Sequence, residues 1–517
     1  MALSEYIAKV GKVIKRDDIR GSYPDSVGTD FAYNLGLALA ETFAEHTAVE
    51  PVNVVVGHDM RLSGPVLAQA LCTGLDDGGY RSIMMGRAGT ELVGFLPAKY
   101  SDVIDGGIMI TASHNRKDDN GFKFYGRGAM PLPMAEKLEP PCPEDQVQRI
   151  ALAVKKRSVP TRLKWEDFAP DYIKTAVERG GLDFQKASAG AKRPFRVAVE
   201  AGNGMGGQIM REFAKLTPQF EWTFSHDVPD GNFPLIIPNP LNAEYQKIVH
   251  DLVLRTKSDV GVCFDGDADR MVLFDETGGV VSPPLLAAQV GTMLRRKLGP
   301  KARTAFNLAS SWVVPDMLGD RSDVLGGSGA LMTPVGYGKI KPIMYADPSI
   351  AFGAEHSGHY MFREFWCADS GMLAGLIMLE MAAELQAQGK TLSGALEESR
   401  RRYAESGEVN FQLPPDRPGD NVIAQAAREL AKELKRLYVV VEDHCRLVDS
   451  YPPPGLELSV SDLRAEADKW WFCMRKSGTE AGAGDLLRLY VEADGDRTLM
   501  ERKRDALVKL VGPELRI

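Results

Sequence analysis

Short apolar runs that end in glycine or aspartate and then pass into helix-like segments recur along this chain, and they constrain its fold more than any other feature. Residues 52–57, 195–199 and 260–264 are three such runs. A run of this length and composition is typical of a buried β-strand, and the small residues after it permit a tight turn. The alternation predicts an α/β fold, in which side chains on the loops after the strands gather at functional sites.

The loop after one further apolar run contains a candidate nucleophile. The segment Gly107-Ile-Met-Ile-Thr-Ala-Ser-His-Asn115 carries the hydroxyl of Ser113 into a turn of small polar residues. A hydroxyl is a poor nucleophile unless a base, a metal ion or a positive field activates it. Ser113 is therefore a candidate only if such groups lie elsewhere in the chain.

A candidate metal site follows the apolar run 260–264. There, Asp265, Asp267 and Asp269 recur at every second position with only glycine or alanine between them. Three crowded carboxylates repel one another unless a cation neutralises them, and ligation by oxygen alone favours a hard ion such as Mg2+. An exposed acidic turn is the alternative, but it does not explain the adjacent Arg270, whose guanidinium can reach a phosphate near a metal.

The spacing of these aspartates also invites comparison with a calcium-binding EF-hand loop, because Glu276 is the twelfth residue counted from Asp265. Two features argue against an EF-hand. Arg270 stands at the sixth position, where that turn requires glycine, and residues 260–264 and 271–274 are predicted to be strands instead of helices.

A third loop, Gly353–His359, combines a carboxylate, a hydroxyl and two imidazoles with two glycines. The side chains of Glu355 and Ser357 can hydrogen-bond to neighbouring sugar hydroxyls, and His359 is a candidate for proton transfer. Taken alone, the segment is as compatible with an ordinary polar turn as with a sugar site.

A fourth loop, Met474–Glu480, contains two cations, two hydroxyls and a glycine. Arg475, Lys476 and the backbone N–H groups around Gly478 form a candidate cradle for an anion. Guanidinium, hydroxyl and backbone donors together suit a phosphate monoester. A solvated surface turn is the alternative for this pattern taken alone.

In order along the chain, the segments TASHN, DGDADR, GAEHSGH and RKSGTE resemble the signature set of the α-D-phosphohexomutase superfamily, with the phosphomannomutase/phosphoglucomutase branch the nearest. Asp18–Gly21 and Gly57–Ser63 are similar to two further motifs of that superfamily. The resemblance implies four domains around a central cleft: three similar α/β domains with mixed sheets and a smaller C-terminal α+β domain. With turn composition as a guide, the expected domains are 1–158, 159–280, 281–405 and 406–517, each with one signature loop.

The resemblance also implies roles for individual residues. It implies that Ser113 carries a phosphoryl group and, with Asp265, Asp267 and Asp269, ligates one Mg2+. The implied catalytic set is Ser113, His114, Lys123, Arg20, Arg270 and His359. The general base stays open among Lys123, His359 and His114. The implied substrate-binding set is Glu355, Ser357, His359, Arg475, Ser477, Gly478, Thr479 and Tyr337.

Four positions depart from the usual superfamily pattern. Arg116 stands where proline commonly follows the TASHN segment, and Tyr337 stands where many relatives carry histidine. Gly478 replaces a frequent asparagine, and Ala481 replaces a proline at the start of an Ala-Gly-Ala-Gly stretch. These departures bear on substrate preference and on the shape of the phosphate loop.

The function that the resemblance implies is that of a phosphomannomutase. Such an enzyme interconverts mannose 6-phosphate and mannose 1-phosphate through a phosphoserine and a hexose 1,6-bisphosphate, which is also its activator. A phosphoglucomutase or a dual enzyme is the alternative, because mannose and glucose differ only at C2, and a phosphoglucosamine mutase is a less favoured one. A metal-dependent sugar phosphatase and a non-catalytic sugar-phosphate binding protein are alternatives from other classes.

One glycine-rich segment also fits a different cofactor. Gly202, Gly204 and Gly207 have the Gly-x-Gly-x-x-Gly spacing of a dinucleotide-binding turn, and Asp227 follows at a suitable distance. The same stretch is similar to a Gly-Asn-Gly-x-Gly turn of the superfamily, so we expect it to be a structural turn.

The composition is that of a large soluble enzyme, with 517 residues, 44% of them hydrophobic and 26% charged, and a formal net charge of -8. The acidic balance disfavours nucleic-acid binding. Six widely separated cysteines without a Cys-x-x-Cys pair fit a reducing compartment, and the sequence contains neither a basic leader nor a membrane-spanning run. We therefore expect a cytoplasmic monomer or homodimer that takes a hexose phosphate and binds neither nucleic acid nor a membrane.

Overall fold

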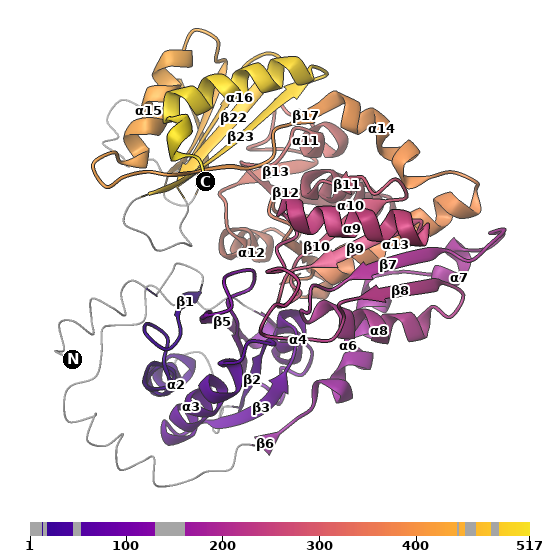
Figure 1. Ribbon diagram of the computed structural model, residues 1–517, viewed down its shortest axis with the longest axis vertical. Helices are drawn as coiled ribbons and strands as arrows, with labels where there is room; N and C mark the ends of the chain where they lie inside the picture. Colours follow the sequence, from indigo (N-terminus) through magenta and orange to yellow (C-terminus); the bar gives the residue numbers. More distant parts are fainter. Residues whose placement is uncertain are drawn as a thin grey trace. The chain divides into compact units, whose positions relative to one another are not determined.

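The structure is a computed structural model that describes residues 13, 18–44, 53–129, 161–441, 444–449, 462–476 and 485–517 (Figure 1). The chain divides into two units. The first comprises Met1–Ser282 and His359–Ser393, and the second comprises Pro283–Gly358 and Gly394–Ile517. The predicted boundary at residue 158 lies outside the described residues.

The first sheet of the first unit is formed by the N-terminal part of the chain. Its strands follow the order β1-β5-β4-β2-β3-β6. Strands β2, β3 and β4 run parallel, whereas β5 is antiparallel to both β4 and β1. The strands are β1 (Ile19–Ser22), β2 (Asn53–His58), β3 (Arg81–Arg87), β4 (Gly106–Ile110), β5 (Asp119–Gly126) and β6 (Thr161–Arg162).

Helices pack closely around this sheet. They are α2 (Thr29–Ala44), α3 (Gly64–Asp77) and α4 (Thr90–Lys99), with the short η1 (Arg127–Ala129) after β5. Gly36 and Gly74 lie where α2 and α3 meet, and a Cβ atom on either would collide with backbone atoms of the other helix. The two helices therefore pack backbone to backbone, and β2 and β4 are buried along nearly their whole length.

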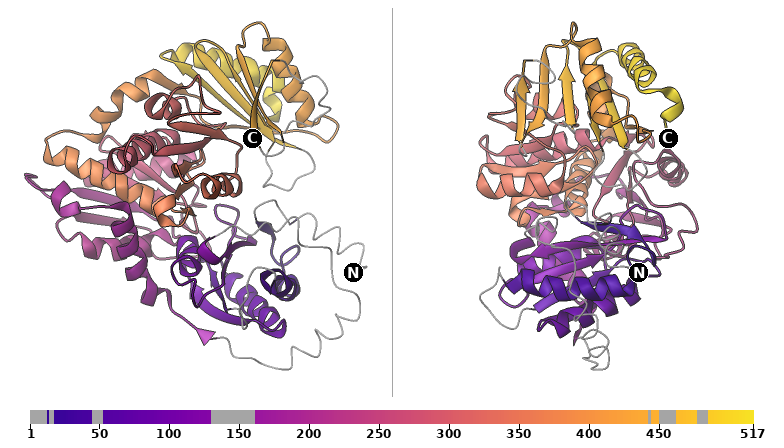
Figure 2. Two further views of the ribbon diagram at one scale, coloured as in Figure 1. Left: turned by 180° about the vertical axis from the view of Figure 1, so that it is seen from behind. Right: turned by 90° about the vertical axis from the view of Figure 1, so that its left-hand side faces the viewer.

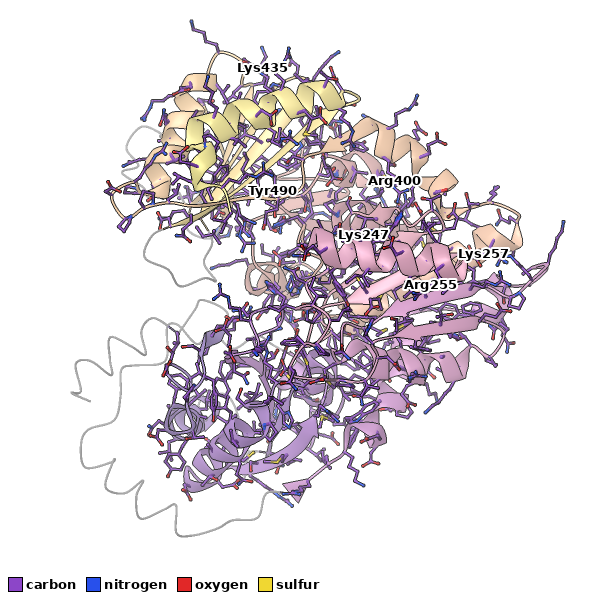
Figure 3. The ribbon with its side chains drawn as sticks, viewed as in Figure 1. Lys247, Arg255, Lys257, Arg400, Lys435 and Tyr490 are labelled. Atoms are coloured by element: carbon purple, nitrogen blue, oxygen red, sulfur yellow. The ribbon has the colours of Figure 1, made fainter. Side chains whose placement is uncertain are left out.

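The second sheet of the first unit follows the order β11-β10-β9-β7-β8. Strand β7 is parallel to β8 and β9, and β9 and β10 form an antiparallel hairpin. The strands are β7 (Arg196–Glu200), β8 (Glu221–Ser225), β9 (Val260–Phe264), β10 (Met271–Asp275) and β11 (Val280–Val281). The helices of this region are α6 (Trp165–Gly180), α7 (Phe184–Ala187), α8 (Gly206–Leu216) and α9 (Ala243–Thr256). Lys247 and Arg255 on α9, and Lys257 just after it, are exposed (Figure 3).

A later stretch of the chain completes the first unit. It contains β15 (Tyr360–Phe362), η2 (Arg363–Phe365), β16 (Ala368–Asp369) and α13 (Gly371–Ala387). Helix α13 is apolar on nearly all sides because it packs against α6, α7, β9 and β10. A Cβ atom on Gly371 would meet Asp269 O and Met271 N at 2.8 Å, so the start of α13 lies directly against the β9–β10 loop.

The second unit begins with three parallel strands in the order β13-β12-β14. These are β12 (Arg303–Asn307), β13 (Ala330–Thr333) and β14 (Ile350–Ala354). The helices around them are α10 (Pro283–Leu298), α11 (Val313–Leu318) and α12 (Tyr337–Ala346).

The C-terminal sheet of the second unit is antiparallel, with order β17-β23-β22-β21-β19-β20 and β18 paired to β23. Its strands are β17 (Tyr403–Glu405), β18 (Val409–Gln412), β19 (Arg436–Val441), β20 (His444–Val448), β21 (Asp462–Glu466), β22 (Trp470–Lys476) and β23 (Leu486–Asp494). The helices are α14 (Leu392–Arg402), α15 (Gly419–Leu430) and α16 (Arg497–Val511), followed by η3 (Pro513–Leu515). Helices α15 and α16 contact each other and cover one face of the sheet (Figure 2).

A buried polar network joins this sheet to the loop after β12. Arg464 is 1% exposed, and its guanidinium lies 3.7 Å from the ring centroid of Trp471. Arg464 Nε donates to Glu466 Oε1 over 2.7 Å, and the Trp312 indole donates to the same oxygen over 2.9 Å. Glu492 accepts from the indole of Trp471 and from the backbone of Trp312. Arg464 and Glu466 therefore form a buried pair, whereas Glu492 Oε2 accepts no hydrogen bond from the described residues.

The architecture confirms the predicted fold class: α/β domains with mixed parallel and antiparallel sheets, followed by a C-terminal domain with an antiparallel sheet. The predicted strands at 52–57, 195–199 and 260–264 correspond to β2, β7 and β9. Among the described residues, no helix is both long and apolar enough to cross a lipid bilayer.

Candidate active site

Ser113 lies in the turn between β4 and β5, here called the serine turn (residues 111–119). Its hydroxyl points at the loop between β9 and β10, here called the metal loop (residues 265–270). Its backbone has a left-handed φ of 51°, which is unusual for a residue other than glycine. The Ser113 N–H donates to Thr111 Oγ1 over 2.8 Å, which fixes the turn. Ser113 Oγ donates to Asp265 Oδ2 over 2.7 Å, although the two residues are 152 positions apart in the sequence.

The three aspartates converge at the tip of the β9–β10 hairpin. Asp265, Asp267 and Asp269 each offer one carboxylate oxygen within 4.8 Å of the others, and all three side chains are buried. Asp267 Oδ1 and Asp269 Oδ1 accept no hydrogen bond from any described residue. Buried carboxylate oxygens without a donor fit a hard cation, so this group can hold a metal ion.

Two cations of the chain itself already face these carboxylates. Lys123 Nζ, from β5, lies 2.7 Å from Asp267 Oδ2 and also donates to Asp269. Arg270 Nε donates to Asp265 Oδ2 over 2.9 Å, and Arg270 Nη2 donates to Ser113 Oγ over 3.1 Å. Two positive charges oppose three negative ones, which leaves a site that still attracts a cation.

The protonation of these groups follows from burial and from their neighbours. Burial raises the pKa of Asp265 to about 7, although Arg270 acts in the opposite direction. Burial and Asp269 act to raise the pKa of Asp267, but Lys123 and the hydrogen bond from Thr90 together outweigh them, so this pKa lies below its ordinary value. The two carboxylates beside Lys123 hold the pKa of its ammonium well above the ordinary value in spite of burial, so Lys123 is a cation at neutral pH.

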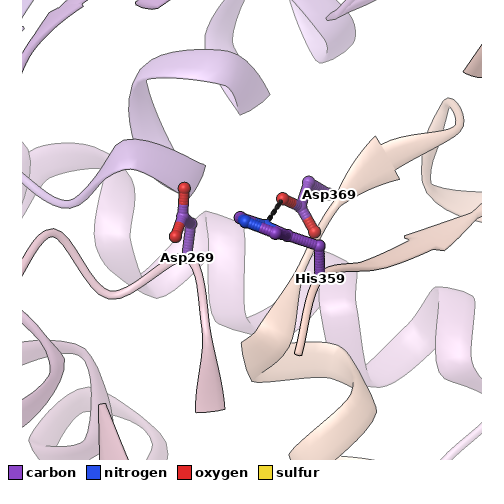
Figure 4. A group of neighbouring side chains, drawn as sticks. All are labelled: Asp269, His359 and Asp369. Atoms are coloured by element: carbon purple, nitrogen blue, oxygen red, sulfur yellow. Dashed lines mark hydrogen bonds and ion pairs between the residues drawn. The ribbon is translucent and has the colours of Figure 1, made fainter. Parts of the chain in front are cut away.

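His359 belongs to the same cluster through Asp269. His359 Nδ1 lies 2.5 Å from Asp369 Oδ2, and side-chain atoms of both lie within 4.8 Å of an Asp269 oxygen (Figure 4). Burial lowers the pKa of the imidazole, but Asp369 and Asp269 together raise it to about 9. His359 is therefore an imidazolium in this arrangement, held by Asp369, whose other oxygen accepts the Tyr360 N–H.

Two further predicted residues lie beside the serine turn. His114 Nδ1 is 3.1 Å from Ser113 Oγ and also receives a hydrogen bond from Arg270. Arg20, on β1, donates to Asp18 over 2.7 Å and reaches Asn115 Oδ1 at 3.4 Å. The first unit thus brings Ser113, His114, Arg20, Lys123, Arg270, His359 and the three aspartates into one cluster.

The second unit contains the predicted sugar-binding side chains. Glu355 is 3% exposed, and its Oε1 accepts hydrogen bonds from Asn307 Nδ2 over 2.9 Å and from Gly336 N over 2.7 Å. The Gly336 contact places Tyr337, the first residue of α12, next to Glu355 in the structure. Ser357 is half-buried and makes no hydrogen bond to another described residue.

Arg475, near the end of β22, is a partly buried cation. Its Nε atom is fully buried and finds no acceptor among the described residues, while Asp462 and Arg488 lie opposite Arg475 on β21 and β23. Ser477, Gly478, Thr479 and Ala481 lie outside the described residues. Lys476, the other predicted cradle cation, pairs with Asp420 at 3.1 Å and with Asp485 at 3.7 Å. The roles of both cations in binding an anion stay predictions.

Models of one protein family match most of the chain. The phosphoglucomutase/phosphomannomutase alpha/beta/alpha domains I, II and III match residues 11–140, 170–279 and 285–403. The chain belongs to this family. It is thereby a member of the α-D-phosphohexomutase superfamily, as its sequence motifs predict.

Individual relatives resemble the chain over nearly its whole length. A protein of Xanthomonas campestris pv. campestris described as phosphohexose mutases is 31% identical over 96% of this chain and 98% of its own. A phosphomannomutase of Escherichia coli K12 is 29% identical over 96% and 98%. A crystal structure of a phosphoglucomutase/phosphomannomutase family protein from Burkholderia thailandensis has a TM-score of 0.72 and 23% identity over 98% of both chains, which supports the same fold.

The structure decides between two interpretations of the glycine-rich segment in this family member. A Cβ atom on Gly204 would lie 2.8 Å from Gly266 O and 3.1 Å from Asp265 O, and Met205 N donates to Gly266 O over 2.9 Å. The segment is therefore a structural turn that supports the metal loop, as expected. The EF-hand comparison fails as well, because β9 and β10 flank the loop and Glu276 accepts from Ser393 N over 3.2 Å.

Several residues of this cluster were not singled out from the sequence. Thr90 Oγ1 donates to Asp267 Oδ2 over 2.6 Å, and Asp369 holds His359. Arg61 binds the backbone of the serine turn. Arg61 had a signal, since it lies within the Gly57–Ser63 motif. Thr90 acts across 177 positions, whereas Asp369 lies only 10 positions after His359 but outside the Gly353–His359 loop.

Proposed function

We propose that this protein is a phosphomannomutase, which interconverts mannose 6-phosphate and mannose 1-phosphate through phosphorylated Ser113. The observation that carries the proposal is the position of Ser113 Oγ, 2.7 Å from Asp265 Oδ2 and 3.1 Å from Arg270 Nη2. The relatives named phosphomannomutase support the same substrate. A phosphoglucomutase or a dual enzyme is the second candidate. The residues that are proposed to hold the sugar would bind O3, O4 and the phosphate, and such contacts do not distinguish the epimers at C2.

The proposed chemistry is a pair of phosphoryl transfers. In the first, the bond between phosphorus and Ser113 Oγ breaks while a bond forms from phosphorus to O1 of a hexose 6-phosphate. O1 loses its proton and Ser113 Oγ gains one, which gives a hexose 1,6-bisphosphate and the free Ser113 hydroxyl. In the second, after the sugar has turned end for end, Ser113 takes back the 6-phosphoryl group and the hexose 1-phosphate leaves. Arg270, which donates to Ser113 Oγ, and Arg20, which reaches the neighbouring Asn115, would neutralise the phosphoryl oxygens at Ser113.

We infer that the metal ion is Mg2+ and that Asp265, Asp267, Asp269 and a phosphoryl oxygen on Ser113 would hold it. The two buried oxygens without donors support this set of ligands. When bound, Mg2+ supplies Lewis-acid stabilisation of the phosphoryl charge. The hexose 1,6-bisphosphate would also serve as activator, since it restores the phosphate on Ser113.

Proton transfer is proposed to involve histidines rather than Lys123. Lys123 is held as a cation by Asp267 and Asp269, so it neutralises charge and accepts no proton in this arrangement. His359 begins as an imidazolium and is suited to protonate a departing sugar oxygen. His114 is the further candidate: its Nδ1 lies 3.1 Å from Ser113 Oγ, and it can take the Ser113 proton only when Arg270, which donates to the same nitrogen, turns to the phosphoryl group.

The substrate is proposed to be held by groups of the second unit. Arg475, together with Ser477, Gly478 and Thr479, would bind the phosphate that is not being transferred, because a guanidinium whose buried Nε has no acceptor among the described residues favours an anion. Glu355 and Ser357 would hold O3 and O4 in both orientations of the sugar, with Tyr337 beside them.

The location, the oligomeric state and the binding partners of the enzyme are also proposals. We infer a cytoplasmic enzyme, monomeric or homodimeric, that binds neither nucleic acid nor a membrane. The five described cysteines, Cys72, Cys263, Cys367, Cys445 and Cys473, form no disulfide, which is compatible with a reducing compartment.

A coupled assay tests the proposal. The protein is given mannose, glucose, glucosamine and N-acetylglucosamine 1-phosphates in turn, with Mg2+ and a trace of hexose 1,6-bisphosphate. Mannose 1-phosphate is expected to give the highest kcat/KM, and Ser113→Ala is expected to abolish turnover while sugar-phosphate binding persists. Ser322→Ala, at an exposed position, is the matched control.

Each alternative has its own outcome in this assay. Release of inorganic phosphate with turnover would indicate a phosphatase, and binding without any turnover would indicate a binding protein. Full activity of Ser113→Ala would rule out Ser113 as the nucleophile.

A further inference from the structure

We propose that Arg61 is a positioning residue that fixes the backbone of the serine turn. The reaction needs the planar set of N–H donors of its guanidinium and not its charge alone. The inference rests on the proposed role of Ser113 and concerns how that side chain is held. Arg61 belongs to the loop between β2 and α3, and it is 1% exposed.

The guanidinium of Arg61 binds the backbone of the serine turn at four points. Nη2 donates to Ser113 O over 3.0 Å and to Asn115 O over 2.9 Å. Nη1 donates to Asp119 O over 2.8 Å and to Arg116 O. Four carbonyl dipoles that converge on one place repel one another, so a cation with several directed donors is needed where they meet.

Asp59 links Arg61 to the backbone N–H of Ser113 through Thr111. Asp59 Oδ2 accepts from Arg61 Nε over 3.1 Å and from Thr111 Oγ1 over 2.7 Å. Thr111 Oγ1 in turn accepts the Ser113 N–H over 2.8 Å. The N–H of Ser113 is thus fixed through Thr111 and its carbonyl through Arg61, so both backbone polar groups of the nucleophile depend on one buried ion pair.

This double anchor explains the conformation of Ser113. A left-handed φ of 51° is strained for a serine, and such a conformation persists only where surrounding contacts enforce it. The conformation directs Oγ toward Asp265 and Arg270. Arg61 donates to neither of those groups, and the ring of Phe233 lies 5.4 Å from its Cζ, so Arg61 acts through the turn.

Lysine cannot replace arginine in this position. A guanidinium presents five N–H donors in a fixed plane, whereas an ammonium presents three from a single atom. Arg61→Lys therefore keeps the charge beside Asp59 but cannot span carbonyls on both sides of the turn. The misplaced Ser113 lowers the rate of phosphoryl transfer and leaves the sugar-binding residues unchanged.

The test separates kcat from KM. For Arg61→Lys we expect kcat to fall by about 100-fold, the effect of roughly 1 Å of misplacement, with the KM for the hexose phosphate within about threefold of wild type. We expect the single-turnover rate of Ser113 phosphorylation by hexose 1,6-bisphosphate, measured by intact mass, to fall in parallel. Arg61→Ala is expected to regain part of its kcat when methylguanidinium is added. Arg211→Lys, at an exposed ion pair, is the control.

A second pair of variants keeps the test valid if the Arg61 variants fail to fold. Thr111→Val removes only the hydroxyl between Asp59 and the Ser113 N–H, and Thr111→Ser retains it. We expect the valine variant to lose kcat with KM unchanged and the serine variant to remain near wild type. Near-wild-type kcat in folded Arg61→Lys, or equal activity of the two Thr111 variants, overturns the proposal. Activity in Ser113→Ala would instead overturn the proposed function.

Discussion

Lys123 and Asp267 form a buried ion pair, with Nζ 2.7 Å from Oδ2 and side chains that are 4% and 0% exposed. The chain thus supplies its own positive charge to the carboxylates that are proposed to bind the metal. A lysine in this place limits the repulsion between the aspartates before an ion binds.

The first prediction concerns this pair. Lys123→Met leaves two buried carboxylates without their counter-charge, which costs about 3–5 kcal/mol, so the melting temperature of the metal-free protein is expected to fall. Added Mg2+ is expected to raise the melting temperature of the variant more than that of wild type, since the ion replaces the missing charge. Thermal denaturation with EDTA and with Mg2+ measures both effects. Lys174→Met, at an exposed pair, is the control; an equal Mg2+ response in wild type and Lys123→Met would contradict the prediction.

The second prediction concerns pH and Glu91, on α4. Glu91 accepts from Met372 N over 3.0 Å, from Ser370 Oγ over 2.6 Å and from Tyr172, and burial raises its pKa from 4.5 to about 8. Because the folded-state pKa is the higher one, the stability that Glu91 contributes is complete below pH 4.5 and is lost as the pH rises to 8. The loss amounts to about 1.4 kcal/mol per pH unit.

Glu91→Gln removes this titration and keeps the acceptor oxygen. Relative to wild type, the variant is expected to gain stability steadily between pH 5 and pH 8 and to change no further above that. Urea denaturation of both proteins across this range gives the difference in unfolding free energy. Glu166→Gln, at an exposed position on α6, controls for general charge effects. A difference that does not vary with pH would show that Glu91 does not titrate in this window.

The third prediction concerns phosphate binding by Arg475. Arg475→Lys loses the bidentate geometry of the guanidinium, so the KM for hexose phosphate is expected to rise roughly 10- to 100-fold. The rate of Ser113 phosphorylation by saturating bisphosphate is expected to change much less. Steady-state and single-turnover kinetics separate the two effects, with Arg428→Lys on the exposed side of α15 as control. A variant with unchanged KM and reduced kcat would place Arg475 outside the phosphate site.

The fourth prediction concerns the network between β21 and the loop after β12. Glu466→Ala leaves Arg464 and the Trp312 indole buried without their shared acceptor. We expect a loss of about 3–5 kcal/mol in stability. Glu433→Ala, which removes an exposed partner of Lys503, is expected to change stability by less than about 1 kcal/mol. Equal effects of the two substitutions, measured by thermal denaturation, would mean that the network is not stabilising.

The sequence was sufficient to predict the elements that depend on local pattern. The strands β2, β7 and β9 were predicted because buried strands are short apolar runs. The loop of Asp265, Asp267 and Asp269 was predicted to be flanked by strands, and the β9–β10 hairpin confirms this. The roles of the individual site residues stay predictions that the experiments above address.

Contacts that depend on tertiary packing were not predictable in the same way. The Glu91 contacts join residues about 280 positions apart, and no periodic pattern encodes such a distance. Lys476 follows Arg475 directly, yet adjacent residues on a strand point to opposite faces, so Lys476 pairs with Asp420 whereas Arg475 Nε is buried without an acceptor among the described residues. The contact between Lys123 and the aspartates similarly depends on which strand lies beside the hairpin.

Helix α13 has a consequence for the order of events during protein synthesis. It packs against β9, β10, α6 and α7, but the ribosome produces it only after β12, β13 and β14 of the other unit have been made. The growing polypeptide must therefore carry an uncovered apolar surface on its first unit for about one hundred codons. That interval is where we expect a nascent chain of this protein to depend most on chaperones.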